Sequence, residues 1–284
     1  MVLLSPALLV LAVVTLAPFA FLLLTSLTPL NLARPGTWWD FSRPLANFAE
    51  LPGDGRFLNS LGVQLRLSVF TVAAQLLLGL SAALLLNRDS RVLEAIRALF
   101  IIPMVLPPII VAIIWKVLFT PDISVLNWGL GLLRLPQPAW LADPKLALPA
   151  LVVADVWEWF PFTLLMLLAA LKMMPTEPLE AARIDGAGPW QVFRHVVLPL
   201  LRPAIVVTVL FRLIESVKAF PLIFIMTGGG PGTVTEATNY YAFLQGFTYS
   251  LIGFSAAISV VVLAATFLVS YLIVSWAGAR VDVE

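Results

Sequence analysis

Long stretches without a charged side chain dominate this chain. No Asp, Glu, Lys or Arg occurs in residues 1–33, 67–87, 98–115 or 237–279. Two further stretches, 146–171 and 200–226, are apolar but interrupted by charges. Apolar runs of about 18 or more residues predict membrane-spanning helices. The runs are continuous rather than alternating, which excludes a transmembrane β-barrel.

The pattern predicts an all-α, polytopic membrane protein. We expect six transmembrane helices, at about 3–27, 59–86, 98–119, 146–171, 202–226 and 251–276. Residues 1–284 would form a single transmembrane domain with no separate soluble domain. We expect the first helix to be retained as a span, because it lacks a basic leading segment and is too long for the apolar core of a signal peptide.

Composition agrees with this class and excludes others. The chain is 61% hydrophobic and 12% charged, whereas a soluble domain carries about 25% charged residues. A net charge of +1 gives no basic footprint for nucleic acid. With no cysteine, disulfides, thiol catalysis and cysteine metal sites are excluded. The one histidine, His195, has no set of neighbouring ligands, so we expect no metal site there.

Basic residues orient the predicted helices. With both termini in the cytoplasm, the inner segments carry eight Lys and Arg residues, namely Arg88, Arg91, Arg97, Lys172, Arg183, Arg194, Arg202 and Arg280. The outer segments carry five: Arg34, Arg43, Arg56, Arg134 and Lys145. Because basic residues are enriched in cytoplasmic loops, the sequence predicts cytoplasmic termini and a cytoplasmic segment before the fifth span.

That cytoplasmic segment, about 175–199, has the signals of a helix–turn–helix. Pro178 suits the first turn of a helix. Asp185–Gly188 contains two glycines in three residues, which permit a sharp reversal. Pro189 begins a second helix, which we expect Leu198-Pro199 to end, because proline disfavours helix at the residue before it.

The spacing within this loop is distinctive. Glu180-Ala181-Ala182 is followed after three residues by Gly186, and later by Leu198-Pro199. This resembles the EAA loop of ATP-binding-cassette importer permeases, through which ATPase subunits drive the membrane subunit. The resemblance implies an ATPase-coupling site at Glu180, Ala181, Ala182, Asp185, Gly186, Trp190, Leu198 and Pro199. The alternative is an interfacial loop that merely connects two spans.

Further segments narrow the resemblance. Arg97–Pro103 precedes Leu106-Pro107-Pro108, and Thr227–Gly232 leads to Tyr240-Tyr241. Together they are similar to carbohydrate-uptake permeases of the maltose and glycerol-phosphate type. The resemblance implies a multi-pass protein of a prokaryotic plasma (inner) membrane that forms half of a sugar pathway. Its implied partners are a second homologous permease, two cytoplasmic ATPases, an extracytoplasmic solute-binding protein, a sugar or polyol, and membrane lipid.

No cofactor is expected on this chain. The glycine run is not a phosphate loop, because no Gly-Lys-Ser/Thr follows. In the resembled family, the partner ATPases use ATP and Mg²⁺. The run instead permits backbone turns near the outer mouth of the pathway, either as a flexible loop or in contact with the binding protein or solute.

Charges inside the predicted spans form a second candidate site. Asp155 and Glu158 share a face of the fourth helix beside Trp157 and Trp159, and the fifth helix carries Arg212, Glu215 and Lys218. Charged groups at this depth usually face a polar interior. They would either line a solute path or pair internally, as Arg212 with Glu215 or Glu158 with Lys218. The expected pathway residues are Glu158, Trp159, Glu215, Ser216, Lys218 and Gly229.

Three alternatives to a sugar permease were weighed against the sequence. The EAA loop by itself permits a permease for another solute class, such as glycerol phosphate or amino acids. A membrane-embedded enzyme would need a nucleophile–base or metal constellation, which we do not find in the sequence. A stand-alone channel conflicts with a docking loop.

Overall fold

The computed structural model describes residues 5–278, and this part of the chain is helical without β-strands. The prediction of an all-α polytopic membrane protein is confirmed. Five helices are long and apolar enough to cross a membrane, or six if one bent pair counts as a single span. Arg280, counted above for orientation, and the start of the helix expected at 3–27 lie outside the described residues. The single-domain prediction for 1–284 stays a prediction.

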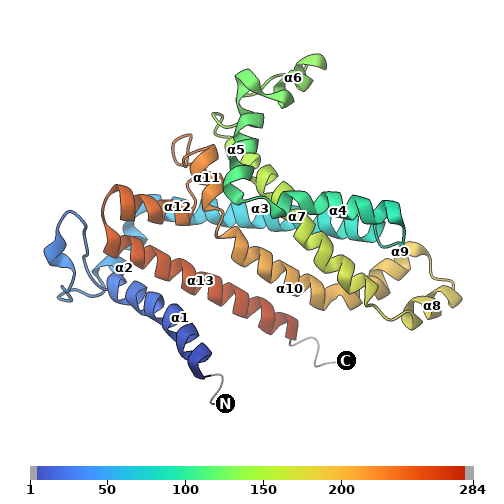
Figure 1. Ribbon diagram of the computed structural model, residues 1–284, viewed down its shortest axis with the longest axis horizontal. Helices are drawn as coiled ribbons and strands as arrows, with labels where there is room; N and C mark the ends of the chain where they lie inside the picture. Colours follow the sequence, from blue (N-terminus) through green and yellow to red (C-terminus); the bar gives the residue numbers. More distant parts are fainter. Residues whose placement is uncertain (1–4, 279–284) are drawn as a thin grey trace. The chain divides into compact units, whose positions relative to one another are not determined.

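The α-helices follow one another along the chain as Figure 1 labels them. Their bounds are α1 (Ser5–Ser26), α2 (Ala46–Glu50), α3 (Gly55–Leu85), α4 (Arg91–Val105), α5 (Pro108–Phe119), α6 (Val125–Leu132), α7 (Ala147–Lys172), α8 (Glu177–Ile184), α9 (Pro189–Val192), α10 (Leu198–Ser216), α11 (Phe220–Met226), α12 (Thr238–Phe243) and α13 (Ile252–Gly278). Short 3₁₀ turns occur at Pro35–Thr37, Leu51–Gly53 and Pro121–Ile123, and π turns at Phe193–Val197 and Leu244–Thr248.

Two of the predicted spans are broken. The helix expected at 98–119 is the pair α4 and α5, bent by 97° (Figure 1). Leu106 between them is extended, with φ −71° and ψ 141°, because Pro107 disfavours helix at the residue before it. The helix expected at 202–226 ends at Ser216 and resumes at Phe220. Neither break was predicted from the sequence, because the spans were placed by apolar length alone.

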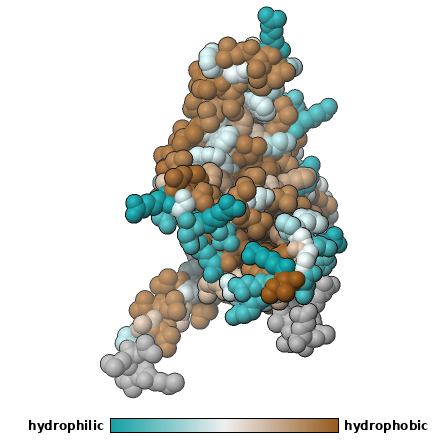
Figure 2. All heavy atoms as spheres, turned by 90° about the vertical axis from the view of Figure 1, so that its right-hand side faces the viewer, coloured by the Kyte–Doolittle hydropathy of each residue, from teal (hydrophilic) through white to brown (hydrophobic). Residues whose placement is uncertain are grey.

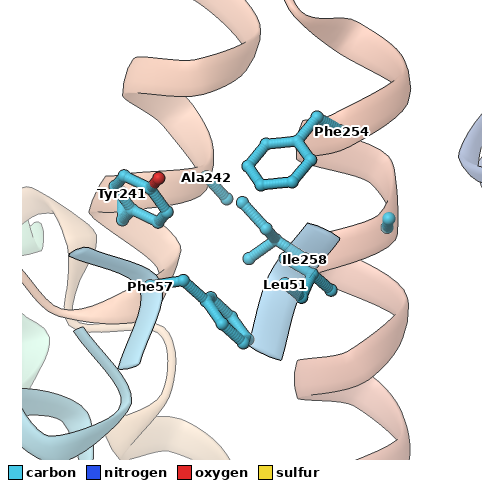
Figure 3. Close-up of a cluster of buried hydrophobic side chains, with 7 residues drawn as sticks. Leu51, Phe57, Tyr241, Ala242, Phe254 and Ile258 are labelled. Carbon is cyan, nitrogen blue, oxygen red and sulfur yellow. The ribbon is translucent and has the colours of Figure 1, made fainter. Parts of the chain in front are cut away.

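Contacts within the chain group into two compact units. Of the described residues, one unit comprises 5–64 and 236–268, and the other 65–235 and 269–278. The first has a core of Leu51, Phe57, Tyr241, Ala242, Phe254, Ala257 and Ile258. Figure 3 shows six of these side chains converging from the 51–53 turn, α3, α12 and α13. Asp54 starts α3 by accepting hydrogen bonds from the backbone N–H groups of Arg56 and Phe57, at 2.8 and 3.1 Å.

The second unit packs α3 and α7 closely against one another. Its core includes Leu164, Leu167, Leu171 and Leu201, all buried. Much of its remaining apolar surface is exposed, including Leu77 and Phe211, and Figure 2 shows apolar side chains over much of one face of the molecule. Such a surface suits lipid or other membrane subunits rather than water.

Gly79 permits the close approach of α3 to α7. A Cβ atom at this position would lie 2.6 and 2.7 Å from the Thr163 side chain and 3.0 Å from the Leu164 nitrogen. We therefore expect Gly79→Ala to destabilise the protein by about 1–3 kcal/mol through overpacking. The measurement is thermal unfolding of the detergent-purified chain, with a lower Tm expected.

Gly62→Ala is the matched control on the same helix, since a Cβ there meets no atom within 4 Å. That variant should keep or slightly raise the Tm, because alanine favours helix over glycine by about 1 kcal/mol. Equal Tm values for the two variants would contradict the close contact.

Candidate coupling and translocation sites

The segment between α7 and α10 folds as helix, turn and helix. Helix α8 ends in a Schellman motif, in which the Ala187 N–H donates to the Ala182 carbonyl at 2.9 Å and the Gly186 N–H to the Arg183 carbonyl at 3.1 Å. Gly186 has φ +80°, which glycine adopts without strain. The Gly188 N–H then donates to Gln191 Oε1 at 2.8 Å and opens α9. The predicted reversal at Asp185–Gly188 is therefore present.

The predicted stop at Leu198-Pro199 is wrong. Helix α9, the π turn at Phe193–Val197 and α10 form one uninterrupted helical stretch, Pro189–Ser216 (Figure 1). The Leu198 N–H bonds the carbonyl of Phe193, five residues back. This wider turn lies directly before Pro199 and lets the helix pass a residue that has no N–H to donate. The loop is thus continuous with a membrane-spanning helix.

The loop exposes large apolar side chains among polar ones. Trp190 is 67% exposed and Ile184 86%, and the Trp190 and Phe193 rings pack at 5.4 Å between centroids. Glu180 and Ala181 are also exposed, while Ala182 is half-buried. A hollow of about 350 Å³ lies between the two helices, lined in part by Ala182, Asp185 and Gly186. An apolar, uneven surface on a polar loop is typical of a protein-docking site.

The predicted coupling residues separate into two groups. Glu180 through Trp190 lie on or beside the exposed surface just described. Leu198 is half-buried and Pro199 exposed at the start of α10. Ile184 was not singled out from the sequence, although an isoleucine in a short polar helix was an available signal.

A buried polar network joins α3, α7 and α10 within the apolar spans. Gln75 Oε1 accepts from Arg212 Nε at 2.7 Å, and Gln75 Nε2 donates to Asp155 Oδ2 at 2.8 Å. Arg212 Nη2 lies 3.4 Å from the same Asp155 oxygen. The Arg212 guanidinium also stacks over the Trp159 ring, 4.7 Å from its centroid. All three hydrogen-bonding side chains are buried.

The internal ion pairs differ from those expected. Arg212 pairs with Asp155 rather than Glu215, and Lys218 pairs with Glu215 at 2.8 Å rather than with Glu158. Glu158 is buried, and neither of its carboxylate oxygens has a hydrogen-bond partner among residues 5–278. The spacing on single helices left these pairings ambiguous. Gln75 was not identified from the sequence as part of the site, because the search was for charged residues in the apolar stretches and an amide is uncharged.

The other predicted pathway residues lie in different settings. The Lys218 and Glu215 side chains are 64% and 37% exposed, beside the break between α10 and α11. Ser216 is buried, with its Oγ 2.7 Å from Ser68 Oγ. Gly229 is buried with φ +83°, and its carbonyl accepts from the Thr235 N–H at 3.2 Å. Among the predicted pathway residues, charge is exposed only at the Lys218–Glu215 pair, since Glu158 is buried.

A third ion pair lies in the other unit and was not predicted from the sequence. Arg56 Nε and Nη2 each donate to the Glu236 carboxylate at 2.7 Å, a bidentate arrangement. In the same unit, the Tyr241 hydroxyl donates a hydrogen bond to the Asp54 carboxylate. Burial and this hydrogen bond raise the pKa of Tyr241. The partners are about 180 residues apart in sequence, so no local pattern identified them.

A surface ion pair and an arginine secure the ends of helices in the second unit. Lys172 Nζ lies 2.7 Å from Asp89 Oδ1 and lowers the pKa of that carboxyl. Arg97 donates to the carbonyls of Leu86 and Arg88, in the turn between α3 and α4. Among the described residues, no cluster of three His, Asp or Glu side chains is able to hold a metal ion.

Broken apolar helices, a buried polar network and an exposed loop continuous with a span define a helical membrane permease. Residues 75–283 match the family described as binding-protein-dependent transport system inner membrane component, and the chain belongs to this family. It is accordingly a non-catalytic, multi-pass subunit of the inner membrane.

Individual proteins support the family and the fold. The chain is 36% identical to a probable ABC transporter permease protein, y4oQ, of Sinorhizobium fredii, over 89% of this chain and 82% of that protein. It is also 36% identical to the trehalose/maltose transport system permease protein MalF of Thermococcus litoralis, over 80% and 78%. A crystal structure of a bacterial ABC transporter that imports alginate has a chain of similar fold, with a TM-score of 0.82, 19% identity, and coverage of 98% and 94%.

The turn of the loop depends on Gly186. Because φ +80° costs a residue with a Cβ about 1–2 kcal/mol, Gly186→Ala should loosen the end of α8. We expect faster amide hydrogen exchange at Ala187, whose N–H closes the motif, by about 5- to 30-fold.

Gly188→Ala provides the matched control. Its φ is −69°, and a Cβ would meet only the flexible Gln191 side chain, at 3.6 Å. Exchange at Ala187 should stay near that of the parent chain. Equal acceleration in both variants would contradict the role of the left-handed position.

Proposed function

We propose that the chain is one of two permease subunits of an ATP-driven sugar importer, and that the loop from Glu180 to Trp190 docks onto a cytoplasmic ATPase. The observation that carries this proposal is the continuity of the exposed loop with α10 over residues Pro189–Ser216. A force applied at Trp190 reaches the membrane interior through one helix, without a flexible joint.

The remaining partners follow from the family and its chemistry. A solute-binding protein delivers the solute from outside, as the name of the family indicates. A second permease supplies the other half of the pathway, and two ATPases use ATP and Mg²⁺. Both termini and the loop face the cytoplasm, in accord with the distribution of Lys and Arg.

We propose an uncharged sugar or polyol as the solute. The trehalose/maltose system of the Thermococcus relative is named for such solutes. The Lys218–Glu215 pair supports the choice, because an exposed charge in a span is tolerated where it faces a water-filled path. The pair has no net charge, and its ammonium and carboxylate groups bond hydroxyl groups well.

A charge reversal tests the docking role of the loop. Glu180→Lys should reduce solute uptake and copurification of the ATPase by at least about tenfold, equivalent to ~1.4 kcal/mol of binding. Membrane insertion should be unchanged, because Glu180 is exposed. Uptake into cells and ATPase recovery on affinity purification are the two measurements.

Glu94→Lys serves as its control, since Glu94 is an exposed acid on α4 outside the loop. It should retain both uptake and the ATPase. Normal uptake in the Glu180 variant would reject the docking role.

Neutralising one side chain of the Lys218–Glu215 pair tests whether the pair lines the solute pathway. Glu215→Gln leaves Lys218 without its counter-charge, so a sugar acid should compete about tenfold better against the neutral sugar. Lys218→Gln leaves the carboxylate and should not favour the sugar acid. Competition assays with radiolabelled neutral sugar distinguish the two. Identical competition profiles in both variants and the parent chain would place the pair outside the pathway.

A further inference from the structure

Inside the spans, Glu158 and Arg212 are incompletely paired. Both oxygens of Glu158 and the Nη1 atom of Arg212 are buried without a hydrogen-bond partner in the described part of the chain. Glu158 and Arg212 are each only 1% exposed. An unpaired carboxylate is costly at this depth. Asp155, Glu158 and Arg212 thus supply two acids and one cation but form one ion pair with each other.

Asp155 and Glu158 are positioned to compete for Arg212. They are three residues apart on α7 and so share a face, separated by a rise of about 4.5 Å. The existing contact of Arg212 with Asp155, at 3.4 Å, is longer than a good hydrogen bond. Glu158 directly precedes Trp159, whose ring centroid lies 4.7 Å from the Arg212 guanidinium carbon.

Two neighbours make an exchange of partners inexpensive. Gln75 Nε2 donates to Asp155 Oδ2 at 2.8 Å and to the Asp155 carbonyl at 3.1 Å, so Asp155 keeps hydrogen bonds if Arg212 leaves. The Trp159 ring lies under the guanidinium. A flat aromatic face attracts the cation without fixing its position as a hydrogen bond does.

Helix α10 supplies the motion that the exchange requires. Arg212 lies 22 residues from Trp190 on the uninterrupted stretch Pro189–Ser216, a distance of about 33 Å along a helix. A displacement at the loop therefore becomes an axial displacement of Arg212 along α7.

We propose that Asp155 and Glu158 are alternative partners of Arg212, which passes from one to the other as α10 slides by about one helical turn along α7. The three side chains act as positioning residues that define two discrete registers. Ratchets of one turn between packed helices are a known form of switching. The exchange depends on the proposed docking role of the loop in one respect, because docking supplies the force that moves α10.

Spin labels provide the test, because the chain contains no cysteine of its own. Labels at Met173→Cys, at the end of α7, and Arg194→Cys, in the π turn, report displacement of one helix along the other. Distance distributions are recorded for the assembled transporter by pulsed electron paramagnetic resonance, with and without a non-hydrolysable ATP analogue. We expect two populations, whose ratio changes with nucleotide.

Neutralising each acid should shift the populations in opposite directions. Glu158→Gln should enrich the register paired with Asp155, and Asp155→Asn the other, each by about 5- to 150-fold. A merely structural role predicts shifts of the same sign or none. Glu94→Gln, which changes an exposed acid on α4, should leave the distribution unchanged.

Several outcomes would overturn the exchange. These are a single population in every sample, equal shifts in both variants, or a shift in the control. If Asp155→Asn does not insert into the membrane, Glu158→Gln alone tests the exchange. This variant must deplete the population in which Arg212 pairs with residue 158. Opposite shifts in the isolated chain in nanodiscs, without any nucleotide effect in the complex, would support the exchange and reject the docking role.

Discussion

The requirement that buried charges be satisfied within an apolar environment constrains this protein most strongly. Arg212 is nearly inaccessible to solvent, yet the residues on either side of it in α10, 209–211 and 213–214, are all aliphatic or aromatic. Gln75 and Asp155 hold it from two other helices. Because lipid offers no alternative partner, separating these helices would expose an uncompensated guanidinium. The network therefore fixes which faces of α3, α7 and α10 meet.

A single helical stretch connects the loop to the membrane interior. The π turn at Phe193–Val197 carries the helix past Pro199 without interruption, so the exposed Trp190 and the buried Arg212 belong to one helical stretch. Helix breaks occur instead at Leu106-Pro107 and at 217–219, away from this connection. Rigidity lies along the path from Trp190 to Arg212, and the break that follows Ser216 lies beside the exposed Lys218–Glu215 pair. This arrangement suits a subunit that receives force at one end and alters a polar path at the other.

Sequence patterns performed well where the physics is local. Apolar length identified the spans, because the width of the bilayer sets how many residues must be apolar. The glycine at 186 and the proline at 189 gave the reversal correctly, since backbone preferences act over a few residues. The same local rule failed at Pro199. Proline has no N–H and so cannot make the regular α-helical hydrogen bond. It can still follow a π turn, in which the preceding N–H bonds a carbonyl five residues back.

The chain by itself therefore determined its class, its approximate spans and the position of the loop, since these follow from hydrophobicity and backbone propensity. The tertiary structure decided which acid pairs with which base. The pairs expected from the sequence, Arg212 with Glu215 and Glu158 with Lys218, did not form, and Glu215 pairs with Lys218 three residues away. For Arg212 and Asp155, and for Arg56 and Glu236, partners 57 and 180 residues apart were selected by packing. Long-range pairing depends on which helix faces meet, and that is a property of the whole fold.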